Sequence, residues 1–458
     1  MAMLTPLDGR YSDKLSGLIE VIGEDALTRR RVFVETQYLI ALSQLSLFKL
    51  SPGQKNLLRS LQVLSYKDFK IIKALEFTGY KGVKPTNHDV KAIEYFLRGK
   101  LSSSSFKNRL QWLHFALTSE DVNSVSYALM LREAVEKVFV PLLGGLQNTL
   151  LRTARKYAGL TMLARTHGQA AVPTTFGKEI RVFEYRLSRQ LERLKKQSIS
   201  CKFGGAAGNF NAHFAAFEKI DWPVFAKKFI NSFNKGRRVK IYAAALSTQI
   251  DSHDSYAELF DNLRRVNTIL LDLCQDMWRY ISDGLLLQKT VAGEVGSSTM
   301  PQKVNPIDFE NAEGNFGLAG ALYSYFSAKL PVSRLQRDLS DSTVLRNVGA
   351  AFGYNVLAIK ALARGLSKVE PRPQAFLAQL EERPEVLAEG IQTILRAAGV
   401  ENPYEKLKDL TRGKKITAQG LRDFIEGLAV GADVKARLKK LSVKNYAGIA
   451  AKLARSGK

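Results

Sequence analysis

The sequence predicts an all-α fold, and two observations carry that prediction. Proline is sparse, with 13 in 458 residues, and apolar residues recur at spacings of three and four through long segments. Residues at this spacing share one face of a helix, so each such segment predicts a helix that packs against a core. Strand patterns are weak and predict at most a small hairpin.

The clearest apolar stripe predicts one long helix in the second half of the chain. It runs through Leu259, Leu263, Val266, Leu270, Leu273, Met277 and Ile281. Comparable patterns extend over residues 108–155, 174–199, 307–330 and 343–366. Long helices joined by short loops predict an elongated bundle.

Two changes in composition predict domain boundaries. A run of serines at 102–105 separates an amino-terminal region from the long helices, and a segment with two prolines at 368–373 ends them. Beyond it, helix start signals occur at Thr417 and Ser442. We therefore expect an amino-terminal helical domain at 1–106, a central long-helix domain at 107–367 and a carboxy-terminal helical domain at 368–458.

Composition indicates a cytoplasmic protein without a membrane span. The apolar runs are short, and Asp8 and Arg10 precede any hydrophobic core of a signal peptide. Only two cysteines occur, Cys201 and Cys274, in apparently helical or buried stretches, which is typical of a reducing compartment. The five histidines lie far apart without a paired ligand spacing, so we expect neither a metal nor a cofactor.

The net charge of +25 raises the possibility of nucleic-acid binding. The basic residues are dispersed as short pairs and triplets, however, and no low-complexity basic tail accompanies them. We interpret most of the excess charge as solvated surface. A non-catalytic, basic helical protein that binds nucleic acid stays an alternative hypothesis.

The segment Gly296–Pro306, with the sequence GSSTMPQKVNP, is the most informative feature of the chain. It combines paired serines with Lys303 and Asn305, so that a hydroxyl could act as a base while a lysine holds a carboxylate. A helix is predicted directly afterwards, with Asn305 as N-cap, Pro306 in the first helical position and Asp308 in the first turn. Backbone amides at such a helix start point toward an anion.

Further polar clusters lie elsewhere in the chain. In the first, Thr86 is predicted to cap a helix, which places His88 near the positive helix end and favours its neutral form. The second, LHFALTSED, contains His114, which is more typical of a satisfied core histidine when taken alone. The third, RTHGQ, places His167 in a glycine-containing loop, where polar residues are often functional.

Taken together, these motifs resemble one family. The segments TNHDVKAIEY, HFALTSEDVNS, RTHGQ, GNFNAH, GSSTMPQKVNPIDFEN and QRDLSDSTVLRN, in this order, resemble the bacterial type of the adenylosuccinate lyase family, within the fumarase/aspartase superfamily. The resemblance extends from TPLDGRY at 5–11 to TRGK at 411–414. It implies three helical domains, a homotetramer with a twenty-helix core, and active sites shared between subunits.

The resemblance also implies a reaction. Such a lyase eliminates fumarate from adenylosuccinate to give AMP, and from succinylaminoimidazole carboxamide ribotide to give aminoimidazole carboxamide ribotide, in purine biosynthesis. Ser297 would be the base, His167 the acid for the leaving nitrogen, and Glu310 the carboxylate that pairs with this histidine. A serine is a poor base, so loop amides and Lys303 must stabilise its alkoxide.

The remaining matches to the family would bind the nucleotide substrate. Fixed donors must hold the developing aci-carboxylate, and the matching residues are Thr118, Ser119, Ser298, Lys303 and Asn305. Guanidinium forks suit phosphate, and the phosphate and ribose matches are Arg10, Tyr11, Arg337, Ser342 and Arg346. Further substrate contacts are expected from Asn87, His88, Asp89, His114, Gln249, Val304, Asn311 and Thr343.

One residue departs from the family pattern. Gln302 stands where relatives of the bacterial type usually carry histidine, and the resulting Met-Pro-Gln-Lys resembles argininosuccinate lyase, a sister family. Cleavage of argininosuccinate is therefore the alternative activity. The phosphate-type residues Arg10, Arg337 and Arg346 favour a nucleotide substrate over it.

Overall fold

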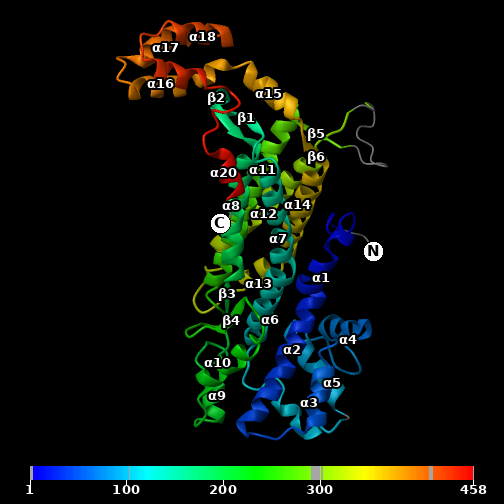
Figure 1. Cartoon of the computed structure of the whole chain (residues 1–458). Coiled ribbons are helices and arrows are strands. Elements are labelled where there is room, and N and C mark those ends of the chain that lie inside the picture. The colour runs from blue at the N-terminus through cyan, green and yellow to red at the C-terminus, as the bar shows by residue number, and fades with distance from the viewer. Residues whose placement is uncertain (1–3, 103, 290–299, 301–302, 412–415, 457–458) are drawn as a thin grey trace. The chain divides into compact units, whose positions relative to one another are not determined.

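The computed structural model describes residues 4–102, 104–289, 300, 303–411 and 416–456 (Figure 1). Helices account for most of this described chain, so the all-α prediction is confirmed. The chain divides into two compact units, each assembled from three stretches. The first unit comprises residues 1–143, 190–268 and 314–360, and the second comprises 144–189, 269–313 and 361–458.

The first unit is built mainly from the amino-terminal helices. The α-helices wholly within it are α1 (Ser16–Ile22), α2 (Glu24–Leu42), α3 (Pro52–Ser60), α4 (Tyr66–Phe77), α5 (Asp89–Leu101), α6 (Ser119–Ala134), α9 (Asn211–Ala216), α10 (Trp222–Ser232) and α13 (Ser340–Leu345). Helix α2 packs against α6 and α5, and α4 packs against α5. An aromatic cluster of Tyr38, Phe203, Phe225 and Phe229 adds to its core.

The second unit contains the carboxy-terminal helices. They are α15 (Pro373–Glu381), α16 (Ala388–Ala397), α17 (Pro403–Thr411), α18 (Ala418–Glu426), α19 (Ala432–Lys439) and α20 (Ala450–Arg455). A small apolar core, including Leu387, Ile391, Leu421 and Leu438, joins several of them. Thr417 caps α18 by accepting a hydrogen bond from the Gly420 amide, as predicted. Ser442 starts only a single turn, so that helix-start prediction is wrong.

The long predicted helices are present as α7 (Val140–Lys156), α8 (Phe176–Lys195), α11 (Asp254–Ser282), α12 (Ile307–Lys329) and α14 (Val348–Lys368). In α11 the stripe from Leu259 to Met277 is buried, so its interpretation as core is confirmed. The boundaries between the two units fall within these helices. The predicted division into three domains stays a prediction.

One of the predicted long helices, over 108–155, is interrupted. A 3₁₀ segment (Lys107–Trp112) is followed by non-helical residues, and α6 begins only at Ser119. The break lies where His114 and Ala116 both adopt φ of 56°, a left-handed conformation that no α-helix accommodates. A π-helical turn (Val135–Phe139) then precedes Pro141, which lacks the N–H that a regular helix would use.

The expectation of at most one small hairpin is wrong. The described residues form three two-stranded sheets. An antiparallel hairpin pairs β1 (Thr161–Thr166) with β2 (Gln169–Thr175), a parallel pair joins β3 (Ser198–Cys201) to β4 (Lys240–Ala243), and β5 (Leu286–Gln288) pairs with β6 (Val369–Pro371). The strands of the last two pairs are too short, at three or four residues, for an alternating pattern to reveal them.

Cys201 in β3 and Cys274 in α11 are both buried free thiols, as the sequence predicted. Among the helices that the structure describes, none is both long and apolar enough to cross a membrane. The described histidine, cysteine and acidic side chains likewise form no cluster of three that could hold a metal ion.

Candidate active site

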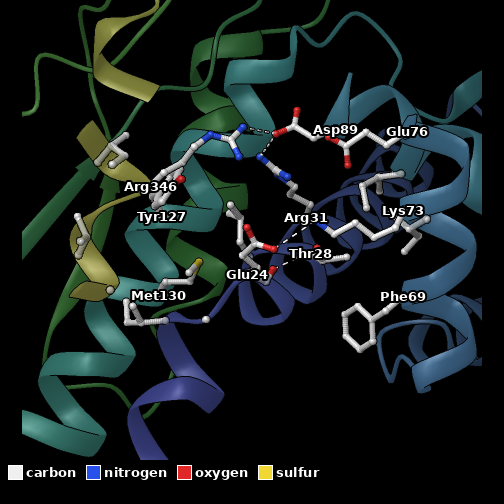
Figure 2. Close-up of a pocket in the computed structure, with 18 of the residues that line it drawn as sticks. Glu24, Thr28, Arg31, Phe69, Lys73, Glu76, Asp89, Tyr127, Met130 and Arg346 are labelled. Atoms are coloured by element: carbon white, nitrogen blue, oxygen red, sulfur yellow. Dashed lines mark hydrogen bonds and ion pairs between the residues drawn. The ribbon is translucent and has the colours of Figure 1, made fainter. Parts of the chain in front are cut away.

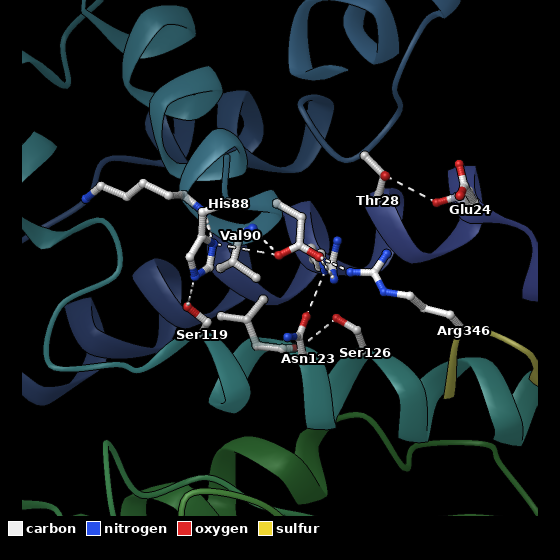
Figure 3. A network of polar contacts seen from close by, with 12 residues as sticks. Glu24, Thr28, His88, Val90, Ser119, Asn123, Ser126 and Arg346 are labelled. Atoms are coloured by element: carbon white, nitrogen blue, oxygen red, sulfur yellow. Dashed lines mark hydrogen bonds and ion pairs between the residues drawn. The ribbon is translucent and has the colours of Figure 1, made fainter. Parts of the chain in front are cut away.

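The start of α5 brings two predicted site residues together in the first unit. The helix begins at Asp89, and its N-cap is His88 rather than the predicted Thr86, because Nδ1 of His88 accepts the Lys91 amide at 3.3 Å. A nitrogen that accepts carries no proton, so the proton of neutral His88 lies on Nε2. That nitrogen is 3.2 Å from Oγ of Ser119 (Figure 3). Asn87 precedes them in a left-handed conformation and is exposed.

The carboxylate of Asp89 is the centre of an ion-pair cluster. It lies 2.7 Å from Nη2 of Arg31 and 3.0 Å from Nη2 of Arg346 (Figure 2). Burial by itself would raise the pKa of Asp89, but Arg31, the Val90 amide and Arg346 outweigh it, and the pKa is lowered. Asp89 is therefore a carboxylate at neutral pH, and it holds Arg346 beside α5.

A cavity of about 180 Å³ adjoins this cluster in the first unit. Its polar wall carries Arg31, Asp89 and Arg346 together with Lys73 and Glu76, while side chains of α1, α2, α4, α5 and α6 supply much of its apolar wall (Figure 2). Asp89 and Arg346 are thus the predicted site residues that line it.

The non-helical residues before α6 are held by α2. Oε1 of Glu35 lies 2.5 Å from Nδ1 of His114, and the hydroxyl of Tyr38 donates to the carbonyl of Phe115 at 3.0 Å. Burial lowers the pKa of His114, but the Glu35 carboxylate outweighs burial, so that the pKa is raised. His114 is therefore a mostly buried, partnered histidine in a left-handed turn, and a substrate contact from it stays a prediction.

The start of α6 fixes Thr118 and Ser119. Asp121, which is fully buried, accepts the Thr118 amide at 2.8 Å and the Gly204 amide at 2.7 Å. The ammonium of Lys202, also fully buried, lies 2.7 Å from the same carboxylate. Burying such charges is tolerated only with close partners, so this pair holds the start of α6 in one geometry.

Arg337 and Gln249, which were each predicted to bind substrate, are in contact. Nη1 of Arg337 donates to Oε1 of Gln249 at 3.4 Å, and its Nη2 lies 3.2 Å from Oε2 of the buried Glu120. Burial is the main cause that raises the pKa of Glu120, although Arg337 opposes it. Ser342 lies in α13, and its carbonyl accepts the Arg346 amide at 3.2 Å. This hydrogen bond places Ser342 and Arg346 on one helical turn.

Three other predicted residues of the first unit lie outside these networks. Thr343 is exposed on α13. The guanidinium of Arg10 lies over the ring of its neighbour Tyr11, with 5.9 Å to the ring centroid. Among the contacts described, no hydrogen bond or ion pair links Arg10 or Tyr11 to the Asp89 cluster. Their role at the nucleotide stays a prediction.

In the second unit, His167 occupies the tip of the β1–β2 hairpin. The loop has two residues, His167 with φ of 53° and Gly168 with φ of 75°, which is the left-handed pair that a tight hairpin turn requires. The imidazole is exposed. Glu310, in the first turn of α12, accepts the indole N–H of Trp278 at 3.0 Å. In the described part of the chain Glu310 thus pairs with Trp278, and its predicted pairing with His167 stays a prediction.

The segment before α12 carries the other predicted residues of the second unit. The helix begins at Ile307, so Pro306 precedes the first helical position instead of occupying it. The Val304 carbonyl accepts the side-chain amide of Gln288 at 2.8 Å, and the Lys303 amide donates to the Met300 carbonyl at 3.0 Å. The side chain of Lys303 is exposed. The predicted residues before and within α12 that are described are Lys303, Val304, Asn305, Glu310 and Asn311, whereas Ser297, Ser298 and Gln302 lie outside the described residues.

Two family descriptions match the chain. Residues 81–318 match the family described as "Lyase", and residues 333–447 match "Adenylosuccinate lyase C-terminal". The adenylosuccinate lyase of Escherichia coli strain K12 is 44% identical over 98% of this chain and 97% of its own length. That of Dictyostelium discoideum is 45% identical over 98% and 97%, respectively. The chain belongs to the adenylosuccinate lyase family.

Solved structures support the fold of this adenylosuccinate lyase family member. A fumarate lyase from Mesorhizobium sp. BNC1 superposes with a TM-score of 0.73 at 15% identity, covering 96% of each chain. The 3-carboxy-cis,cis-muconate lactonizing enzyme of Pseudomonas putida superposes with a TM-score of 0.71 at 16% identity, covering 96% of this chain and 95% of its own. At these identities the superpositions show a shared fold alone.

Sequence reasoning missed the residues that hold the site in place. Arg31 and Glu35 on α2 and Glu120 on α6 contact the predicted residues Asp89, His114 and Arg337, respectively. Tyr38 on α2 and Asn123 on α6 act one contact further away, through the Phe115 carbonyl and through Arg31. The only available signal was weak: charged and polar residues at positions of α2 and α6 that are otherwise buried.

Proposed function

We propose that this protein eliminates fumarate from adenylosuccinate to give AMP, and from succinylaminoimidazole carboxamide ribotide to give aminoimidazole carboxamide ribotide. The observation that carries the proposal is 42–45% identity to adenylosuccinate lyases over nearly the whole chain. The match at 333–447 to the family's own C-terminal description adds to it. This activity places the protein in purine biosynthesis.

In the proposed reaction, Ser297 removes a proton from the carbon beside a carboxylate of the succinyl group. The electron pair of that bond forms the new double bond of fumarate, and the carbon–nitrogen bond breaks. His167 gives the departing nitrogen a proton, and Glu310 stabilises the imidazolium before that transfer. Lys303 and Asn305 hold the aci-carboxylate that develops, and Thr118, Ser119 and Ser298 complete the donors.

The first unit supplies the proposed nucleotide-binding side. Arg337 and Arg346 present guanidinium groups whose planar forks suit phosphate oxygens. The pairing of Arg337 with Gln249 and of His88 with Ser119 supports a site gathered from segments far apart in the sequence. We further propose a cytoplasmic homotetramer, organised in the three predicted domains, in which chains share active sites. The two free buried thiols support a reducing compartment.

A coupled test separates this function from its alternatives. Purified protein is incubated with adenylosuccinate, and AMP and fumarate are quantified by chromatography while the substrate absorbance is followed. We expect equal amounts of the two products, and no cleavage of argininosuccinate at comparable rates. Ser297→Ala, prepared in parallel, controls for contaminating lyase from the host.

Faster cleavage of argininosuccinate would replace the proposed substrate by the alternative one. Absence of turnover together with tight, salt-sensitive DNA binding would support the basic nucleic-acid-binding hypothesis instead.

A further inference from the structure

Arg31 is a buried guanidinium on α2 that belongs to none of the predicted site motifs. Its side chain is only 7% exposed. Nε donates to Oδ1 of Asn123 on α6 at 2.9 Å, and Nη2 donates to Oδ2 of Asp89 on α5 at 2.7 Å. A guanidinium so far removed from water is stable only where its donors are satisfied, so these two contacts fix its orientation.

These contacts belong to a continuous path between the two proposed phosphate arginines. On one side, Asp89 binds Arg346 at 3.0 Å. On the other side, Nδ2 of Asn123 donates to Oε2 of Glu120 at 3.3 Å, and Glu120 binds Arg337 at 3.2 Å. Figure 3 draws Asn123 and Arg346 within one network of polar contacts. The described contacts therefore connect Arg346 to Arg337 through Asp89, the buried Arg31, the half-buried Asn123 and the buried Glu120.

The Arg346 end of the path is more exposed than its centre and than its Arg337 end. The side chain of Arg346 is 55% exposed and follows directly after the short helix α13, so packing constrains it weakly. The carboxylate that holds it, Asp89, lies in the first turn of α5, and its Oδ2 accepts from both Arg31 and Arg346. Loss of Arg31 would leave Asp89 with the exposed Arg346 and, when it is protonated, His88 at 3.7 Å as its ion-pair partners. The orientation of Arg346 thus depends on Arg31, which holds the shared Asp89 carboxylate.

We propose that Arg31 and Asn123 are positioning residues for the substrate phosphate, which set the separation and orientation of Arg346 and Arg337 without contacting substrate themselves. This inference rests on the proposed function, because it takes adenylosuccinate as the ligand. The contacts of Arg31 and Asn123 affect binding of the nucleotide phosphate and not the elimination step. A change in these contacts should therefore weaken nucleotide binding and leave fumarate binding unchanged.

The test uses Arg31→Lys in the full-length protein, with Arg30→Lys as its matched control. Arg30 is the preceding residue of the same helix and pairs with the buried Glu133 at 2.6 Å, outside the path. Both substitutions keep the charge and remove a planar fork, so any general loss of stability in α2 should be similar in the two variants. We measure KM and kcat with adenylosuccinate and the inhibition constants of the two products, AMP and fumarate.

In Arg31→Lys, we expect KM and the AMP inhibition constant to rise by about tenfold, with a smaller change in kcat and an unchanged fumarate constant. Arg30→Lys should leave the ratio of the two inhibition constants as in wild type. Asn123→Ala removes the acceptor of Arg31 without altering charge, so it should reproduce the rise in the AMP inhibition constant. This variant provides the test if Arg31→Lys does not fold. Combination with Arg346→Lys should give less than the product of the two single effects.

Wild-type kinetics in both Arg31→Lys and Asn123→Ala would overturn the inference while the proposed function stood. Equal weakening of AMP and fumarate would also overturn it, because general damage to the site would explain both. A wild-type protein that does not cleave adenylosuccinate would overturn the proposed function first, and the inference with it.

Discussion

Acidification should destabilise the folded protein through His213, a fully buried residue of α9. Its ring packs edge-on against Trp222, with 4.9 Å between centroids, and Nε2 lies 3.4 Å from the Tyr38 hydroxyl. That hydroxyl donates its own proton to the Phe115 carbonyl, so it accepts from His213. Burial, reinforced by Lys202 and only partly opposed by a nearby carboxylate, lowers the pKa of His213 from 6.5 to about 4.

The sign and magnitude follow from proton linkage. Between pH 6.5 and about 4 the unfolded chain binds a proton at His213 that the folded chain does not bind. Stability from this residue is therefore complete above pH 6.5 and is lost as the pH falls toward 4. A separation of about 2.5 pH units corresponds to about 3 kcal/mol of unfolding free energy at about 1.4 kcal/mol per unit. About 2 kcal/mol of this is lost by about pH 5.

His213→Gln isolates the effect because glutamine does not titrate, while its amide can still donate to Tyr38. Denaturant unfolding of both proteins, followed by tryptophan fluorescence, is compared at about pH 7.5 and about pH 5. Wild type should lose about 2 kcal/mol more than the variant between these conditions. Other titrating groups are common to both proteins and cancel in the difference. Equal losses in the two proteins would refute the assignment of a buried, neutral His213.

Three further predictions concern the proposed site. Lysine in place of Arg337 or Arg346 keeps the charge but loses the bidentate fork, so KM should rise. Alanine at either position should weaken substrate binding by about 2 kcal/mol or more. Wild-type KM values in all four variants would remove the phosphate assignment. Ser297→Ala should lower kcat at least about a thousandfold, which is about 4 kcal/mol of barrier. Mixing Ser297→Ala chains with His167→Asn chains should restore part of the activity in hybrid tetramers. Verified hybrids without recovery would contradict shared active sites. Because the pKa of His114 is raised, its charged form adds stability below pH 6.5, and this stability is lost as the pH rises through the raised value. His114→Gln should therefore destabilise the protein more at about pH 6 than at about pH 9. A pH-independent difference would count against the buried ion pair.

Local patterns in the sequence by themselves determined the helical class and much of the proposed chemistry. The stripe from Leu259 to Met277 predicted a buried helix because a spacing of three and four marks one helical face, and the structure buries that face. Thr417 was recognisable as a cap because its hydroxyl acts on an amide three residues away. The motif loops identified the family because their residue types and order are specific over the whole length.

Only the tertiary structure decided where the local preference for a helix or a cap was not realised. The predicted helix over 108–155 breaks at His114 because Glu35 and Tyr38, on another helix, hold the residues around it in left-handed turns. His88 replaces Thr86 as the cap of α5, and its other ring nitrogen meets Ser119 of α6.

The frame that joins Arg31, Asp89, Asn123 and Arg346 is the clearest example of such a tertiary decision. Its members lie on separate elements, up to 315 residues apart, so no window of neighbouring residues contains the pattern. Its central members, Arg31 and Asn123, were not predicted as site residues from their own local sequence. Packing of α2 between α5 and α6 removes water from Arg31, and the cost of an unpaired buried charge then selects the partners.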